Sequence, residues 1–245
     1  MTSKLLAMIK KRIYQLVFLS FFCISYYDAK AQSYSVKSFD GNEAKIELSN
    51  KSRRTLTVSY LKDTVFLTEY IATTKVQVLN GRFLKITYDT RGGSGLDLNN
   101  TLIVSVSKSK INVSMLVTSY AKLVSADKNG LYTSKFNITG NDQSNYKLIV
   151  NVHDQQASKL HPENNYNKNE VVTLNYNPTY HIFYSANRNI NQSFNINDPK
   201  TQQADKQQIK GLLPVIELGQ NAYYYIKGDW YKSGYNYNLF EEYNR

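Results

Sequence analysis

The stretch Lys75-Val76-Gln77-Val78-Leu79-Asn80-Gly81-Arg82-Phe83-Leu84-Lys85-Ile86-Thr87-Tyr88 decides the fold class. Apolar residues occupy every second position before Asn80-Gly81 and again after it. This period of two is typical of strands with one buried face. Because Asn-Gly readily adopts the positive φ angles of a two-residue turn, residues 74–79 and 82–89 are expected to pair as a hairpin.

The same alternation recurs along the chain from residue 33 onward. Asp40-Gly41 predicts a second hairpin between 33–39 and 43–49, and Lys108-Ser109-Lys110 predicts a third between 101–107 and 111–119. Further strands are expected at 55–60, 131–138, 145–153, 170–176, 179–185 and 222–227. Strands at this density predict an all-β fold, specifically an antiparallel β-sandwich with Greek-key-like connections.

Other segments interrupt this pattern. One short surface helix is expected near 199–210, because Asp198-Pro199 can begin a helix and Gly211 can end it. Two polar segments, 154–169 and 185–200, predict long loops that are functional or mobile. A single β-rich domain is expected over 32–245, and the alternative is two β-sandwich domains divided near 121–130.

Residues 1–31 have the three parts of an export signal. A basic region precedes the short apolar stretch 16–24, and Ala29-Lys30-Ala31 supplies the small residues that a signal peptidase requires. The apolar stretch is shorter than the roughly 20 residues that span a bilayer. Cleavage after Ala31 is therefore expected, with a periplasmic or extracellular destination. An uncleaved anchor and lipidation at Cys23 are the alternatives.

The composition narrows the function classes. The 245 residues carry 30 Lys and Arg against 19 Asp and Glu, a net charge of +11, and cleavage would remove five basic residues and one acidic residue to leave +7. Cleavage would also remove Cys23, the single cysteine, so a disulfide scaffold and a Cys-based zinc cluster are excluded. No nucleic-acid-binding motif is visible, and no nucleic-acid partner is predicted. No stretch of the mature chain predicts a transmembrane helix.

Motifs for catalysis are not found in the sequence. Neither a His-Glu-x-x-His zinc signature nor a Gly-x-Ser-x-Gly nucleophile motif occurs. His153-Asp154 ends an expected strand and opens a loop, and because adjacent strand residues point to opposite faces, the two side chains are not expected to converge. The sequence therefore predicts no catalytic residue, metal ligand or cofactor, and it favours a non-enzymatic protein while leaving catalysis open.

Two segments are candidate ligand-binding sites. The C-terminal aromatic hairpin offers Tyr224, Trp230 and Tyr231, whose rings suit sugars and protein surfaces alike. The Gly-rich segment 91–97 begins at Arg91 and ends at Asp97; it is either an anion-holding loop or a plain connection between strands.

These observations favour an exported binding or interaction module of the cell envelope or periplasm, with a carbohydrate or an envelope protein as its partner. A hydrolase acting on an extracellular polymer and a structural component of the envelope are the alternatives.

Overall fold

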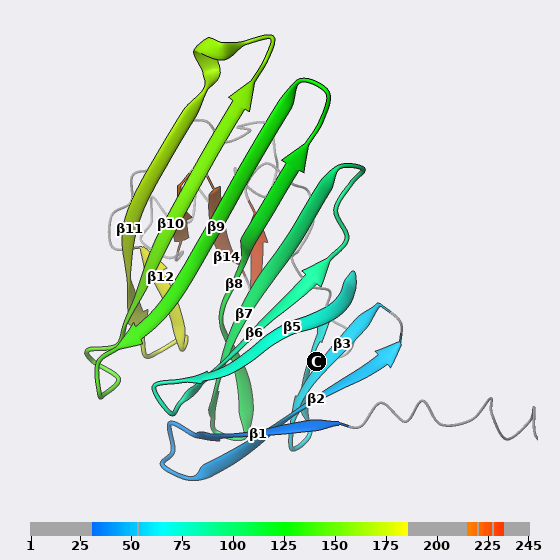
Figure 1. Cartoon of the computed structure of the whole chain (residues 1–245). Coiled ribbons are helices and arrows are strands. Elements are labelled where there is room, and N and C mark those ends of the chain that lie inside the picture. Colours follow the sequence, from blue (N-terminus) through cyan, green and yellow to red (C-terminus); the bar gives the residue numbers. More distant parts are fainter. Residues whose placement is uncertain (1–30, 53, 186–214, 220, 227, 233–245) are drawn as a thin grey trace, which may run out of the picture. The chain divides into compact units, whose positions relative to one another are not determined.

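The computed structural model describes residues 31–52, 54–185, 215–219, 221–226 and 228–232 (Figure 1). Antiparallel strands dominate this part of the chain, and its one helical element is a single 3₁₀ turn, η1 (Pro162–Asn164). The strands are β1 (Gln32–Lys37), β2 (Glu43–Ser52), β3 (Thr55–Tyr60), β4 (Asp63–Leu67), β5 (Tyr70–Leu79), β6 (Phe83–Thr90), β7 (Leu96–Ser107), β8 (Lys110–Val124), β9 (Lys128–Thr139), β10 (Lys147–Ser158), β11 (Tyr166–Asn177), β12 (Ile182–Ser185), β13 (Val215–Leu218), β14 (Asn221–Ile226) and β15 (Asp229–Lys232).

The described strands form three sheets, and neighbours in each sheet are consecutive in the chain. β1 to β4 form a four-stranded sheet, β5 to β12 an eight-stranded sheet and β13 to β15 a three-stranded sheet. The predicted antiparallel all-β fold is confirmed. The Greek-key order is not found among these strands, because within each sheet every strand lies beside the strand that precedes or follows it in the chain.

The hairpin predicted from Asn80-Gly81 is confirmed. β5 pairs antiparallel with β6, and Leu79 lies opposite Phe83. Asn80 and Gly81 adopt the predicted positive φ angles, 50° and 65°, but three residues, Asn80, Gly81 and Arg82, separate the paired ends instead of the expected two.

The long loop predicted at 154–169 is wrong. β10 continues to Ser158 and β11 begins at Tyr166, with His153 opposite Asn169 and Gln156 opposite Tyr166. The backbone hydrogen bonds of a ladder do not require apolar side chains, so polar residues can stand on a sheet face that water covers. Such a segment lacks the alternation by which strands are recognised in a sequence.

One hydrophobic cluster contains residues from all three sheets, among them Ile46, Ile86 and Trp230. The three-stranded sheet is also hydrogen-bonded to β8. Trp230 Nε1 donates to the carbonyl of Val113 over 3.2 Å, and the Thr118 amide donates to Tyr223 Oη over 3.2 Å. These bonds hold the aromatic side chains of β14 and β15 against the centre of the eight-stranded sheet.

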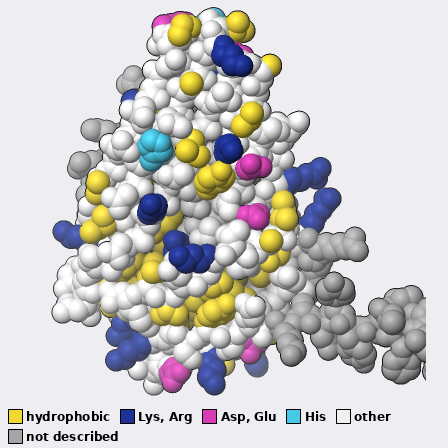
Figure 2. All heavy atoms as spheres, in the orientation of Figure 1, with side chains coloured by type: hydrophobic (Ala, Val, Ile, Leu, Met, Phe, Trp, Pro, Cys, Tyr) yellow, Lys and Arg dark blue, Asp and Glu magenta, His cyan; other side chains and the backbone are white. Residues whose placement is uncertain are grey.

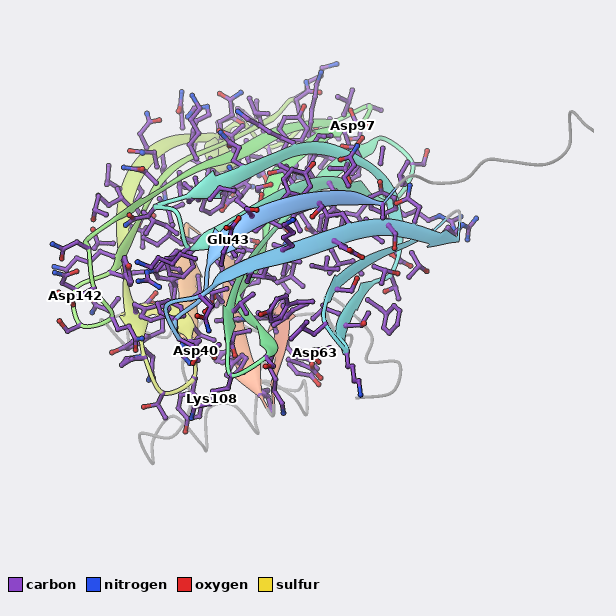
Figure 3. All side chains as sticks on the ribbon, turned by 90° about the horizontal axis from the view of Figure 1, so that it is seen from below. Asp40, Glu43, Asp63, Asp97, Lys108 and Asp142 are labelled. Atoms are coloured by element: carbon purple, nitrogen blue, oxygen red, sulfur yellow. The ribbon has the colours of Figure 1, made fainter. Side chains whose placement is uncertain are left out.

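Two carboxylates fasten the four-stranded sheet to the β7–β8 turn (Figure 3). Asp40 Oδ2 accepts a hydrogen bond from the Lys108 amide over 2.5 Å, and Asp63 Oδ2 accepts one from the Ile111 amide over 2.7 Å. Lys108 and Ser109 have φ angles of 47° and 61°, the positive values of a tight hairpin turn. The turn is therefore held by an acceptor on each side.

An aromatic cluster centred on Phe83 joins strands that are far apart in the sheet order. The Phe83 ring lies 5.3 Å from Tyr146, 5.7 Å from Tyr176 and 5.2 Å from Phe183, between ring centroids. Phe39, between β1 and β2, lies 5.8 Å from the same ring. β6 thus packs against β11 and β12, although four strands separate β6 from β11 in the eight-stranded sheet.

Several sequence predictions fall on or near undescribed residues. The signal peptide, except Ala31, and the helix near 199–210 lie outside the described residues. Residues 121–130 contain the end of β8, a turn and the start of β9, which are paired neighbours in the eight-stranded sheet. Within the described part of the chain, no helix has the length and apolar character to cross a membrane.

Candidate functional site

The paired segment of β8 to β11 between residues 120 and 172 has two distinct faces. Gly219, in the turn between β13 and β14, lies against one of them: a Cβ atom there would be 3.5 Å from Val152 Cγ1 and 3.5 Å from Asp154 Oδ2. We call this the inner face and its opposite the outer face. The ladders joining β8 to β11 have no register shift, so strand alternation assigns each residue to a face.

A groove with a volume of about 430 Å³ crosses these four strands near their tips. Alternation places seven of its lining residues in two rows on the outer face, and the other four, Leu123, Gly130, Gln156 and Tyr166, in a row between them whose side chains point to the inner face. One outer row is Lys122, Leu131, Gln155 and Asn167, and the other is Val124, Asn129 and Ala157. Side chains two residues apart on a strand are separated by about 7 Å, which is the spacing between the two rows.

Gly130 lies in β9 between the two rows but has the parity of the inner face, where a Cβ would lie 3.6 Å from Leu123 Cβ; its missing side chain therefore leaves room on the inner face. Figure 2 shows the molecule from the side away from β14, where scattered Lys, Arg, Asp and Glu side chains stand on a mostly uncharged surface. The groove offers amide groups, aliphatic groups, the phenol of Tyr166 and one ammonium group, and none of its lining residues is a carboxylate.

The Gly-rich segment predicted from the sequence lies at the β8 end of the groove. Asp97 is exposed and directly opposite Lys122, so it extends the first row onto β7. Arg91 is exposed in the loop 91–95, whose Gly95 carbonyl accepts a hydrogen bond from the Val124 amide over 2.8 Å. A Cβ on Gly95 would lie 2.4 Å from the Val124 carbonyl oxygen, so only glycine allows this approach.

The aromatic residues predicted to bind a ligand are buried instead. Tyr224, Trp230 and Tyr231 are 1%, 0% and 8% exposed. The sequence interpretation required one face of this hairpin to meet solvent, but both faces of β14 are covered, since its neighbour Tyr223 is also 0% exposed. These three residues belong to the three-stranded sheet, whereas Arg91 and Asp97 belong to a loop and a strand of the eight-stranded sheet.

The inner face holds a polar pair, Tyr166 and Asp154, of which Tyr166 also lines the groove. Tyr166 Oη donates to Asp154 Oδ1 over 3.2 Å. Desolvation raises the pKa of the Asp154 carboxyl, and desolvation together with the Asp154 charge raises the pKa of Tyr166 to about 12. His153 lies on the outer face and pairs with Asn169 through Nδ1 over 3.0 Å. His153 and Asp154 thus point to opposite faces, as their adjacency predicted.

Asp127 braces the strand tips beside the groove. Its Oδ1 atom accepts hydrogen bonds from Ser158 Oγ over 3.0 Å, from the Lys159 amide over 3.1 Å and from the Leu160 amide over 2.8 Å. These bonds, led by the one from Leu160, lower the pKa of the carboxyl. The β8–β9 turn is therefore tied to the segment that follows β10, next to Asn129 and Ala157 in the groove wall.

The hydrogen bonds that Asp127 accepts predict that the order of these strand tips depends on pH. A lowered pKa means that the ionised carboxylate favours the braced state, so the bracing is fully present above the ordinary Asp pKa of about 3.9 and is lost as the pH falls through the lower folded value. In an NMR titration, the Lys159 and Leu160 amide resonances should move with a midpoint below 3.9. At neutral pH, Asp127→Asn should speed hydrogen exchange at both amides; unchanged exchange would show that the tip does not depend on this charge.

Sequence reasoning missed most residues of the groove, although one signal for them was present. Gln155 and Asn167 lie in the polar segment 154–169, which was interpreted as a functional or mobile loop. Lys122, Val124 and Leu131 carry no such signal, because their shared face appears only when β8 and β9 pair. Among the described residues, no group of three or more His, Cys, Asp or Glu side chains could hold a metal ion.

Fold and groove together define the class of protein: an antiparallel β protein with a groove across four strands, lined by amide and aliphatic side chains. Comparison with protein-family models, curated proteins and solved structures found no match to this chain.

Proposed function

We propose that this chain is an exported, non-enzymatic binding protein that holds an extended glycan chain in the groove on the outer face. The observation that carries the proposal is the groove itself, which lies between two rows of side chains and crosses four strands.

The groove lining matches the chemistry of a sugar chain. The amides of Asn129, Gln155 and Asn167 both donate and accept hydrogen bonds, as sugar hydroxyls require. Leu131 and Ala157 supply aliphatic surface for the C–H faces of sugar rings. Glycoside hydrolysis uses a pair of carboxylic acids beside the scissile bond. The groove lining contains no such pair, and this favours binding over hydrolysis.

Export and sheet packing are parts of the same proposal. The signal-like residues 1–31 support delivery to the periplasm or the cell exterior, where polysaccharides are exposed. The hydrophobic cluster shared by three sheets supports the β-sandwich arrangement predicted from the sequence.

Filling the groove should abolish glycan binding. Ala157 is exposed in the second row, so Ala157→Tyr would place a ring between the rows without disturbing the core. We expect at least a tenfold increase in Kd for any polysaccharide that the wild-type protein binds, measured by isothermal titration calorimetry against a panel of soluble neutral and acidic polysaccharides.

The matched control is Thr173→Tyr, which adds the same ring to an exposed position on β11 outside the groove. It should keep the wild-type Kd. Equal binding by wild type and Ala157→Tyr would place the site elsewhere. Failure of the wild-type protein to bind any polymer of the panel would overturn the proposed function.

A further inference from the structure

We infer that the glycan is acidic, bearing carboxylate or sulfate groups, and that it follows a line of three lysines that begins in the groove. This inference rests on the proposed function and specifies its ligand. The three lysines are Lys122 on β8, Lys135 on β9 and Lys147 on β10, and all are exposed.

The ladder registers place these lysines at a constant step. Lys122 lies opposite Leu131, and Lys135 is four residues further along β9. Lys135 lies opposite Asn151, and Lys147 is four residues from Asn151 in the same direction. Each step therefore covers about 14 Å along the strands and about 5 Å across them. The lysines form a diagonal from the groove down the outer face.

Across β9, β10 and β11, the outer face carries no carboxylate, and the one beside the diagonal is Asp97 on β7, directly opposite Lys122. β9, β10, β11 and residues 120–124 of β8 contain two carboxylates, Asp154 and Glu170. Asp154 is two residues from Val152 on β10, and Glu170 lies opposite Val152 on β11, so both carboxylates stand on the inner face. Asp97, on β7 at the end of the groove row, is the nearest carboxylate placed by the ladders on the outer face. A neutral glycan gains nothing from this segregation, whereas an anionic chain meets three ammonium groups in sequence.

Uncharged hydrogen-bonding groups fill the space along the diagonal. Thr133 and His153 share a row between Lys122 and Lys135, and Asn151 stands beside Lys135. Asn137 lies one row further, between Lys135 and Lys147. An acidic sugar chain on this path would meet ammonium groups for its anions and amide or hydroxyl groups for its remaining oxygens.

The test compares two triple variants that change the net charge equally. The diagonal variant carries Lys122→Gln, Lys135→Gln and Lys147→Gln. The control variant carries Lys37→Gln, Lys45→Gln and Lys62→Gln, which remove three exposed lysines of β1, β2 and the β3–β4 turn. The probes are polygalacturonate, a sulfated polysaccharide and a neutral glucan, with Kd measured at low and high salt.

We expect the wild-type protein to bind at least one acidic polymer more tightly than the glucan and to lose affinity as salt is raised. The diagonal variant should raise that Kd at least tenfold, and the control variant should change it less than threefold. Equal losses in the two triples would overturn the inference, because net charge alone would then explain binding.

Other results separate this inference from the proposed function. The wild-type protein could bind glucan as tightly as the acidic polymers, and Ala157→Tyr could abolish that binding. This result would overturn the acidic ligand but support the groove as a glycan-binding site. Binding to anionic lipid vesicles but to no polysaccharide would overturn both, as would the absence of binding to every probe.

Discussion

Replacing Trp230 by alanine is expected to lower the free energy of unfolding by about 3–5 kcal/mol, the range for removing a fully buried large aromatic side chain. The Trp230 ring is 0% exposed and packs 5.2 Å from the Tyr225 ring, between centroids. The substitution would leave a cavity beside β8 and remove the donor to the Val113 carbonyl. Urea denaturation, followed by circular dichroism, would measure the loss.

Trp230→Phe separates the two contributions. It keeps most of the ring volume but removes the indole N–H, so the loss should be smaller, about 1–3 kcal/mol. If Trp230→Ala kept full stability and instead lost glycan affinity, the residue would be a ligand contact and its assignment to the core would be refuted. The predicted result, lost stability in both variants, assigns the ring to packing.

Phe83→Ala is expected to cost a similar amount, about 3–5 kcal/mol. Phe83 is 0% exposed, and its ring has four aromatic neighbours: Phe39, Tyr146, Tyr176 and Phe183. Aromatic pairs contribute about 0.5–1.5 kcal/mol beyond the area that they bury. Because this cluster joins β6 to β11 and β12, the loss of stability should shift the whole unfolding transition.

Tyr180→Ala is the matched control, because Tyr180 is an aromatic residue that is 51% exposed. It should lower the free energy of unfolding by about 1 kcal/mol or less. A comparable loss in Phe83→Ala and Tyr180→Ala would contradict a core centred on Phe83. Hydrogen exchange offers a second readout, since β11 and β12 should lose protection together with β6 in the Phe83 variant.

The stability and binding predictions concern different parts of the molecule. Trp230 and Phe83 are buried in the shared hydrophobic cluster, whereas the proposed ligand contacts Lys122, Gln155 and Asn167 stand on the outer face of exposed strand tips. Substitutions in the groove should therefore change affinity with little change in stability. This separation allows a lost affinity to be interpreted as a lost contact.

The sequence by itself determined the local structure of this chain. The Asn80-Gly81 hairpin was predictable because positive φ angles and period-two alternation are properties of a few consecutive residues. The Gly-rich segment 91–97 was recognised because its composition is likewise a property of a few consecutive residues. It lies at one end of the groove. Asp97 was thus found from the sequence, although its neighbour Lys122 was not.

Only the tertiary structure decided which faces are buried and which residues share a surface. Tyr224 and Trp230 resemble exposed strand aromatics in sequence, but burial depends on what packs against each face of the strand, and here both faces are covered. The polar parts of β10 and β11, on either side of η1, could not be recognised from the sequence either, because their pairing uses backbone groups that every sequence carries. The groove exists because three ladders align residues of four strands from Lys122 to Asn167, and that alignment is set by register between strands and not by any one segment.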